Sequence, residues 1–190
     1  VNALQERVAA LTGMEAALFM PSGTQSNFCA LLAHCQRGDE YIVGQLAHTY
    51  RYEGGGAAVL GSIQPQPLPN QPDGTIKLDD IAAAIKPDDP HFARTRLLAL
   101  ENTWGGNVLP TGYAEAACDL AHSRGLATHL DGARLFNAAV ASGRIVAPSV
   151  NPWDWPRTSE PSMPEAEITE PAAGDPAIDG KTSLSADHSI

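Results

Sequence analysis

Residues 111–134, TGYAEAACDLAHSRGLATHLDGAR, contain a helix, a strand and a polar turn in one short run. Apolar residues recur at helical spacing as far as Arg124, Gly125 is suited to end a helix, and residues 126–130 have the apolar character of a buried strand. The polar turn DGAR, residues 131–134, follows directly. Ligands of parallel α/β sheets bind at the carboxyl ends of the strands, so this turn is the first candidate for a binding site.

Strands and helices alternate along the rest of the first 146 residues. Short apolar runs predict strands at residues 16–20, 41–44 and 96–100. Helical spacing and stop signals predict helices at residues 2–12, 24–35, 50–60, 77–85 and 135–141, of which 50–60 is weakened by three glycines. This alternation predicts the α/β class, with a mainly parallel sheet flanked by helices and right-handed crossovers.

The composition changes near residue 147. Residues 1–146 carry ten basic and fourteen acidic residues, a net charge of −4, whereas residues 147–190 carry two and eight, a net charge of −6. The second segment also holds seven of the fifteen prolines. Such a segment buries too little apolar surface to offset its ordering entropy. We therefore expect one domain over 1–146 and a disordered tail over 147–190.

The overall composition excludes several classes of partner. A net charge of −10 argues against nucleic acid or an anionic membrane surface, and no apolar run approaches the length of a membrane span. The three cysteines, Cys29, Cys35 and Cys118, show no metal-ligand spacing, so we expect free thiols, no metal and a reducing cytoplasm.

A second polar turn, Ser22-Gly23-Thr24, precedes the predicted helix at 24–35. Glycine lets a ligand approach the backbone closely, and the free amides of a helix N-terminus attract anions, so this turn is a candidate phosphate cradle. The alternative is an ordinary helix cap, because any strand-to-helix turn favours these residues.

The turn at 131–134 suits a heterocyclic cofactor. The carboxylate of Asp131 can hold a ring nitrogen protonated, as in pyridoxal phosphate (PLP) enzymes, where the ring then accepts electrons from the substrate. Arg134 has the planar fork that matches a substrate carboxylate. The alternative is a helix-capping aspartate beside a surface arginine. His48 could stack on the cofactor or take a proton, and His91 lies in a loop, although a single histidine is more often structural.

Five segments taken together resemble one family. They are ERVAALTGMEAALF (6–19), PSGTQSN (21–27), GAAVLGSIQPQPL (56–68), LENTWGGNVLP (100–110) and HLDGARLFNA (129–138). The chain from residue 1 to about residue 143 is similar to the low-specificity L-threonine aldolases, which are fold-type-I PLP enzymes. The resemblance implies the large, PLP-dependent-transferase-like domain of that fold, incomplete in this chain.

The resemblance also implies an activity, which is cleavage of L-threonine or L-allo-threonine to glycine and acetaldehyde. It implies that Ser22, Gly23 and Thr24 bind the phosphate, that His48 stacks on the ring and is the first candidate base, and that His91 matches a second histidine near the substrate. Asp131 would pair with the pyridine nitrogen, and Arg134 with the cofactor or the substrate carboxylate. Members of the family are generally tetramers whose active sites are completed across a dimer interface.

The chain departs from the family pattern at three places. An N-terminal SDTVTRP-like segment is absent, and Trp104 stands where the family has a histidine. The lysine that holds PLP in the family follows an SLS triplet, but here Lys181 precedes one. Lys77 begins the predicted helix at 77–85, and Lys86 directly follows it. We therefore expect weak PLP binding and little turnover of threonine by this chain.

Two other functions stay open from the sequence. One is another fold-type-I lyase that performs β-elimination on aromatic or sulfur amino acids, since it would use the same cofactor residues. The other is a non-catalytic fragment or subunit that pairs with a full-length copy. A nicotinamide-binding domain is disfavoured, because the chain has no GxGxxG motif.

Overall fold

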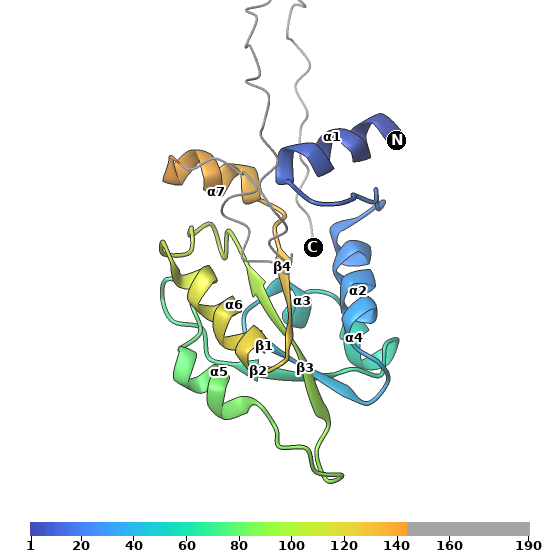
Figure 1. Ribbon diagram of the computed structural model, residues 1–190, viewed down its shortest axis with the longest axis vertical. Coiled ribbons are helices and arrows are strands. Elements are labelled where there is room, and N and C mark those ends of the chain that lie inside the picture. The colour runs from blue at the N-terminus through green and yellow to red at the C-terminus, as the bar shows by residue number, and fades with distance from the viewer. Residues whose placement is uncertain (144–190) are drawn as a thin grey trace, which may run out of the picture. The chain divides into compact units, whose positions relative to one another are not determined.

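The computed structural model describes residues 1–143, so the predicted tail and Lys181 lie outside the described residues. The described chain alternates helices and strands in the order shown by colour in Figure 1. The elements are α1 (Asn2–Thr12), α2 (Gly23–His34), β1 (Asp39–Gly44), α3 (His48–Arg51), α4 (Gly56–Val59), β2 (Gln64–Leu68), α5 (Leu78–Ala84), β3 (Arg94–Glu101), α6 (Tyr113–Ser123), β4 (Ala127–Asp131) and α7 (Leu135–Ser142).

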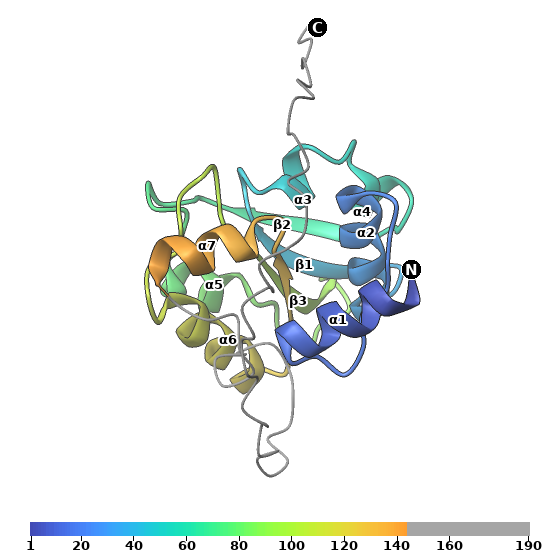
Figure 2. The same cartoon turned by 90° about the horizontal axis from the view of Figure 1, so that it is seen from above.

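The four described strands form one sheet in the order β2-β1-β3-β4, and every neighbouring pair is parallel. The predicted parallel sheet is therefore confirmed. Helices α2 and α4 lie on one side of it and α5 and α6 on the other, in both views of the molecule (Figures 1 and 2). None of the described helices is long and apolar enough to cross a membrane.

Alternating side chains of the strands build one apolar core on each face of the sheet. Tyr41 and Val43 of β1 pack with residues of α2 and α4, whereas Ile42 packs with residues of α5 and α6. Full burial of one such aliphatic side chain is worth about 1.5–3 kcal/mol, and a one-residue slip would turn it to the wrong face. This packing fixes the register that places Glu101 of β3 opposite Asp131 of β4 at the carboxyl edge.

The strand predicted at residues 16–20 does not form. This segment has an irregular backbone, and the side chains of Leu18 and Phe19 are 73% and 53% exposed. The backbone N–H of Phe19 donates to Oε1 of Gln5 at 2.8 Å instead of to a neighbouring strand. Local apolar content therefore predicted a strand that has no partner in the described sheet.

The edge strand β2 was missed by the sequence analysis because it contains Pro65 and Pro67. Proline lacks an N–H, and a central strand needs its N–H groups because they donate to neighbouring strands on both sides. It is tolerated here because β2 pairs only with β1 among the described strands.

The weak helix predicted at residues 50–60 forms as two short helices, α3 and α4. Gly54 and Gly55 separate them with φ angles of 61° and 68°, in the left-handed region that favours glycine. This break places Glu53 in the turn between the two helices. The helices predicted at 77–85, 111–124 and 135–141 form close to those bounds.

Candidate functional site

A cleft of about 600 Å³ lies at the carboxyl ends of the strands. The N-terminus of α2, the short helix α3 and the ends of β3 and β4 contribute to its walls, which include Gly23, Thr24, His48, Glu101, Asp131 and Arg134. A volume of this size accommodates a cofactor-sized ligand. The tertiary structure thus brings together five residues that the sequence analysis selected, and Ser22 directly precedes Gly23.

Asp131 is the last residue of β4 and is 8% exposed. Its Oδ2 accepts a hydrogen bond from Nδ2 of Asn27 at 2.9 Å, and its Oδ1 accepts one from the backbone N–H of Ala133 at 3.2 Å. Each carboxylate oxygen can accept a further bond. The arrangement holds a carboxylate at the cleft wall with acceptor capacity left for a ligand.

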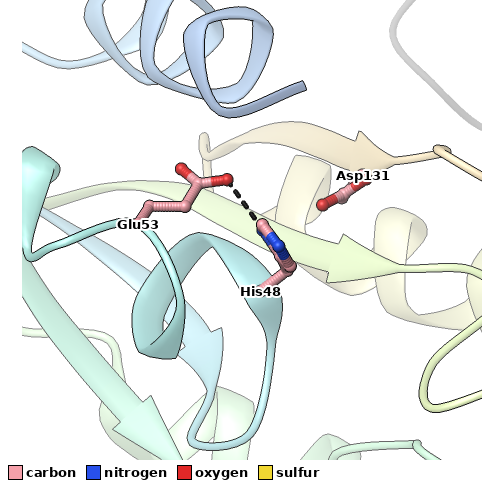
Figure 3. A group of neighbouring side chains, drawn as sticks. All are labelled: His48, Glu53 and Asp131. Atoms are coloured by element: carbon pink, nitrogen blue, oxygen red, sulfur yellow. Dashed lines mark hydrogen bonds and ion pairs between the residues drawn. The ribbon is translucent and has the colours of Figure 1, made fainter. Parts of the chain in front are cut away.

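His48 begins α3, and its ring lies against Glu53 (Figure 3). Nδ1 of His48 is 3.0 Å from Oε1 of Glu53, a side chain that is only 4% exposed. Because an ionised carboxylate only accepts, Nδ1 carries the proton of this bond and Nε2 of a neutral His48 can act as an acceptor. The backbone N–H of His48 donates to Oε2 of Glu101 at 2.8 Å. Both the ring and the backbone of His48 are therefore held by carboxylates.

The residue that joins these carboxylates is Asn27, which the sequence analysis did not select. Its side chain is buried, and Nδ2 donates to Oε1 of Glu53 at 2.8 Å as well as to Asp131. Its Oδ1 faces Nε2 of His129 at 3.0 Å. The position of Asn27 on the same predicted helix as the phosphate cradle was the only signal in the sequence. Its partners are set by how α2 packs on β4.

Two ionisable side chains in or beside the cleft, Glu101 and His129, have shifted pKa values. Burial raises the pKa of Glu101, and the negative charge of Asp131 adds to this effect, against the opposing hydrogen bond from the His48 N–H. Burial lowers the pKa of His129 to about 4, so its imidazole is neutral at physiological pH. Perturbed ionisable groups in a cleft are typical of functional sites.

His48, Glu53 and Asp131 offer ligand atoms within 4.8 Å of one another, close enough to hold a metal ion (Figure 3). The amide of Asn27, however, already donates one hydrogen to Glu53 and the other to Asp131. A cation between the two carboxylates would have to displace this donor. The geometry therefore favours the amide, rather than a metal, as the group that bridges the two carboxylates.

The turn predicted as a candidate phosphate cradle lies at the start of α2. Ser22 caps the helix with an extended backbone, and its Oγ accepts a hydrogen bond from the N–H of Gln25 at 3.2 Å. The N–H groups of Gly23 and Thr24 belong to the first turn, which has no intrahelical acceptor for them. Apart from its chain neighbours and the backbone of its own helix, no described atom lies within 4 Å of the position that a Cβ on Gly23 would occupy. Space and donors for an anion are thus both present.

His91 is not brought into the cleft of its own chain. It precedes β3, whose eight residues span about 25 Å to the carboxyl edge at Glu101. Its side chain is 86% exposed and pairs with Asp89, with 2.7 Å between Nδ1 and Oδ1. We therefore leave His91 out of the proposed site.

Neither Lys77 nor Lys86, the two lysines of the described residues, lines the cleft. Lys77 is exposed and immediately precedes α5. Nζ of Lys86 is 3.2 Å from Oε1 of the buried Glu40, near the amino end of β1. No described lysine is therefore placed to hold a ligand in the cleft.

Trp104 forms part of the cleft wall beyond the end of β3. It packs on Gly74, where an added Cβ would lie 2.9 Å from Cε3 of the indole. Gly74 also has a φ of 88°. The absence of a side chain at position 74 therefore makes room for Trp104.

Comparison with known proteins gives relatives along most of the chain. The family model of the beta-eliminating lyases matches residues 1–158. The low specificity L-threonine aldolase of Escherichia coli K12 is 62% identical over 143 residues, which cover 75% of this chain and 43% of that protein. Low-specificity L-threonine aldolase 1 of Arabidopsis thaliana is 43% identical over 148 residues, covering 74% of this chain and 41% of the relative.

A solved structure shows the same fold. The threonine aldolase of Leishmania major superimposes with a TM-score of 0.61 at 27% identity, covering 70% of this chain and 39% of that one. The expected fold, a parallel sheet flanked by helices as in the fold-type-I enzymes, is thereby confirmed. The chain spans less than half the length of the curated relatives that it matches. By the match of its residues 1–158, this chain belongs to the beta-eliminating lyase family.

Proposed function

We propose that this chain forms the PLP-binding part of an aldehyde-lyase that cleaves L-threonine or L-allo-threonine to glycine and acetaldehyde. The observation that carries the proposal is the buried carboxylate of Asp131 in a cleft that also contains His48 and the N-terminus of α2. The 62% identity to the Escherichia coli aldolase supports the choice of substrate.

The residues of the cleft fit PLP in three respects. The first turn of α2 offers N–H groups and open space at Gly23 for a phosphate. Asp131 offers a carboxylate for a protonated ring nitrogen. Oγ1 of Thr103 is a buried polar atom on the cleft wall that has no hydrogen-bond partner among the described residues, so a ligand group would satisfy it.

Each proposed role follows from a property of the residue. Asp131 would keep the ring nitrogen protonated, and PLP, when bound, supplies an electron-accepting ring for negative charge at Cα of the substrate. Arg134, exposed at the cleft wall, would bind the substrate carboxylate through its planar guanidinium. His48, whose Nδ1 faces Glu53, would accept the proton of the β-hydroxyl at Nε2.

The first experiment is a PLP titration of the full 190-residue chain, followed by borohydride reduction and mass spectrometry. We expect saturable binding and no adduct on Lys77 or Lys86, because neither lines the cleft. An adduct on either lysine would contradict the site, and absence of saturable binding would contradict the cofactor.

The second experiment measures acetaldehyde release from L-threonine and L-allo-threonine. We expect slow release at most, because the described residues provide no lysine in the cleft. Release at an ordinary enzymatic rate would contradict this part of the proposal. Release of ammonia and a keto acid from sulfur or aromatic amino acids, without acetaldehyde from threonine, would favour the β-eliminating alternative.

The resemblance to the aldolases further leads us to propose a homo-oligomer, a dimer or tetramer, in the cytoplasm. Among the described residues, Cys29 and Cys35 form no disulfide, which suits a reducing compartment. Light scattering of the purified chain would test the oligomer.

A further inference from the structure

One buried amide, the side chain of Asn27, connects two carboxylates of the candidate site, Glu53 and Asp131. Asn27 is 5% exposed, and its Nδ2 lies 2.8 Å from Oε1 of Glu53 and 2.9 Å from Oδ2 of Asp131. An amide nitrogen carries two hydrogens, so both are used, one for each carboxylate. The same oxygen of Glu53, Oε1, also accepts a hydrogen bond from Nδ1 of His48 at 3.0 Å.

The orientation of this amide is set by His129 of β4. Oδ1 of Asn27 can only accept, so Nε2 of His129, 3.0 Å away, carries the proton of that bond. If the amide were turned round, Oδ1 would face two carboxylates and Nδ2 would lose both carboxylate acceptors. Because burial keeps His129 neutral, its one N–H is committed to Asn27.

We propose that Asn27 is the positioning residue of this cleft, whose single amide, oriented by His129, sets the positions of Asp131 and Glu53 and through Glu53 that of His48. The proposal rests on the proposed function, since it assigns Asp131 to the cofactor ring and His48 to the substrate. The proposal requires no contact of Asn27 itself with the cofactor or with the substrate. Without the amide, the negative charges of Glu53 and Asp131 would repel each other. The amide donates a charge-assisted hydrogen bond to each of them, which offsets this repulsion.

The first test uses the wild-type chain without cofactor and follows side-chain nitrogens by NMR. We expect the ring of His129 to be neutral with its proton on Nε2 between pH 5.5 and 8, and both amide protons of Asn27 to exchange slowly. Asn137, exposed on α7, is the internal reference for a free amide. A His129 protonated on Nδ1 or titrating near its ordinary pKa, or an Asn27 amide that exchanges like that of Asn137, would overturn the proposal.

The second test replaces the donor. Asn27→Asp keeps the shape and the acceptor for His129 but removes the N–H pair and adds a third carboxylate. The ionisable groups bonded to Asn27 are Glu53, Asp131 and His129. The same cleft is lined by His48, Glu101 and Arg134, and His34 of α2 acts electrostatically on His129. We expect PLP affinity to fall about tenfold at pH 8, because Asp131, which would contact the cofactor, loses one hydrogen bond and 1.4 kcal/mol corresponds to tenfold.

The pH dependence separates positioning from general damage. At pH 5.5 a proton shared among the three carboxylates restores one donor, so the variant should recover to within about threefold of wild type. Asn137→Asp adds the same charge on an exposed face of α7 and should bind PLP like wild type at both pH values. An Asn27→Asp variant that binds PLP like wild type at pH 8, or that is weakened equally at both pH values, would contradict the proposal.

Two variants at His129 test whether a side-chain N–H donor at this position is sufficient for PLP binding. His129→Leu removes the N–H that orients the amide and should weaken PLP binding about tenfold, whereas His129→Gln retains a donor and should stay within about threefold. Equal affinities for the two variants would count against the role of His129. If the wild-type chain does not bind PLP at all, the proposed function fails, but the NMR test still decides the arrangement of Asn27, Glu53 and His129.

Discussion

Asn27 and Asp131 are 104 residues apart in the sequence and are joined by a buried hydrogen bond of 2.9 Å. This bond connects the helix that begins at the phosphate cradle with the strand that ends at the candidate ring-nitrogen ligand. Two parts of the proposed PLP site are thereby connected by a hydrogen bond within the protein that needs no ligand.

Asp131→Asn should weaken PLP binding by about 10- to 100-fold, because a neutral amide cannot stabilise a protonated ring nitrogen as a carboxylate does. The measurement is a fluorescence titration with PLP at pH 7.5. Asp119→Asn removes the same charge from an exposed position of α6 and should leave the affinity unchanged. Equal binding by both variants would exclude Asp131 from the cofactor site.

Ser22→Ala should lower the free energy of unfolding by about 1 kcal/mol, because Oγ of Ser22 caps α2 through the N–H of Gln25. Urea denaturation without cofactor measures this term directly. Ser26→Ala, at an exposed position in the first turn of the same helix, is the matched control and should change stability little. If both variants lose the same stability, the cap contributes nothing specific.

Glu101→Gln should stabilise the chain at neutral pH and much less in acid. Burial raises the pKa of Glu101 in the folded state, so its ionisation favours the unfolded chain once the pH rises above the ordinary value of 4.5. The stability gained by the variant relative to wild type should therefore grow from pH 4 to pH 7. Denaturation curves across this range measure it, with Glu115→Gln on the exposed face of α6 as a control that shows no such trend. A gain that does not vary with pH would refute the raised pKa.

Gly74→Ala should destabilise the chain by about 2 kcal/mol, because position 74 combines a φ of 88° with an approach of 2.9 Å to the indole of Trp104. Gly56→Ala is the matched control, since Gly56 lies at the start of α4 and its Cβ position has no described atom within 4 Å apart from its chain neighbours and the backbone of its own helix. That variant should be neutral or stabilised by about 0.5 kcal/mol. Thermal unfolding compares the two, and an unaffected Gly74→Ala protein would show that Trp104 does not need this space.

Sequence patterning was sufficient for the architecture near the site. Apolar strands alternating with amphipathic helices predicted a parallel sheet, and the polar turn after residues 126–130 predicted a site with Asp131 and Arg134 at the carboxyl edge. The prediction worked because strand direction and side-chain alternation are local properties. It did not work at residues 16–20, where an apolar run has no neighbouring strand, or at β2, where two prolines conceal an edge strand.

The partners of the individual polar groups depended on packing between distant segments. Asn27, Glu53 and His129 are ordinary polar residues in the sequence, and they meet because α2 packs against β4 and because two glycines break the chain after α3. His91, which the resemblance suggested, lies at the opposite edge because β3 separates it from the cleft. Hydrogen bonds are directional and short, so which donor reaches which acceptor is determined only when the sheet and its helices have packed.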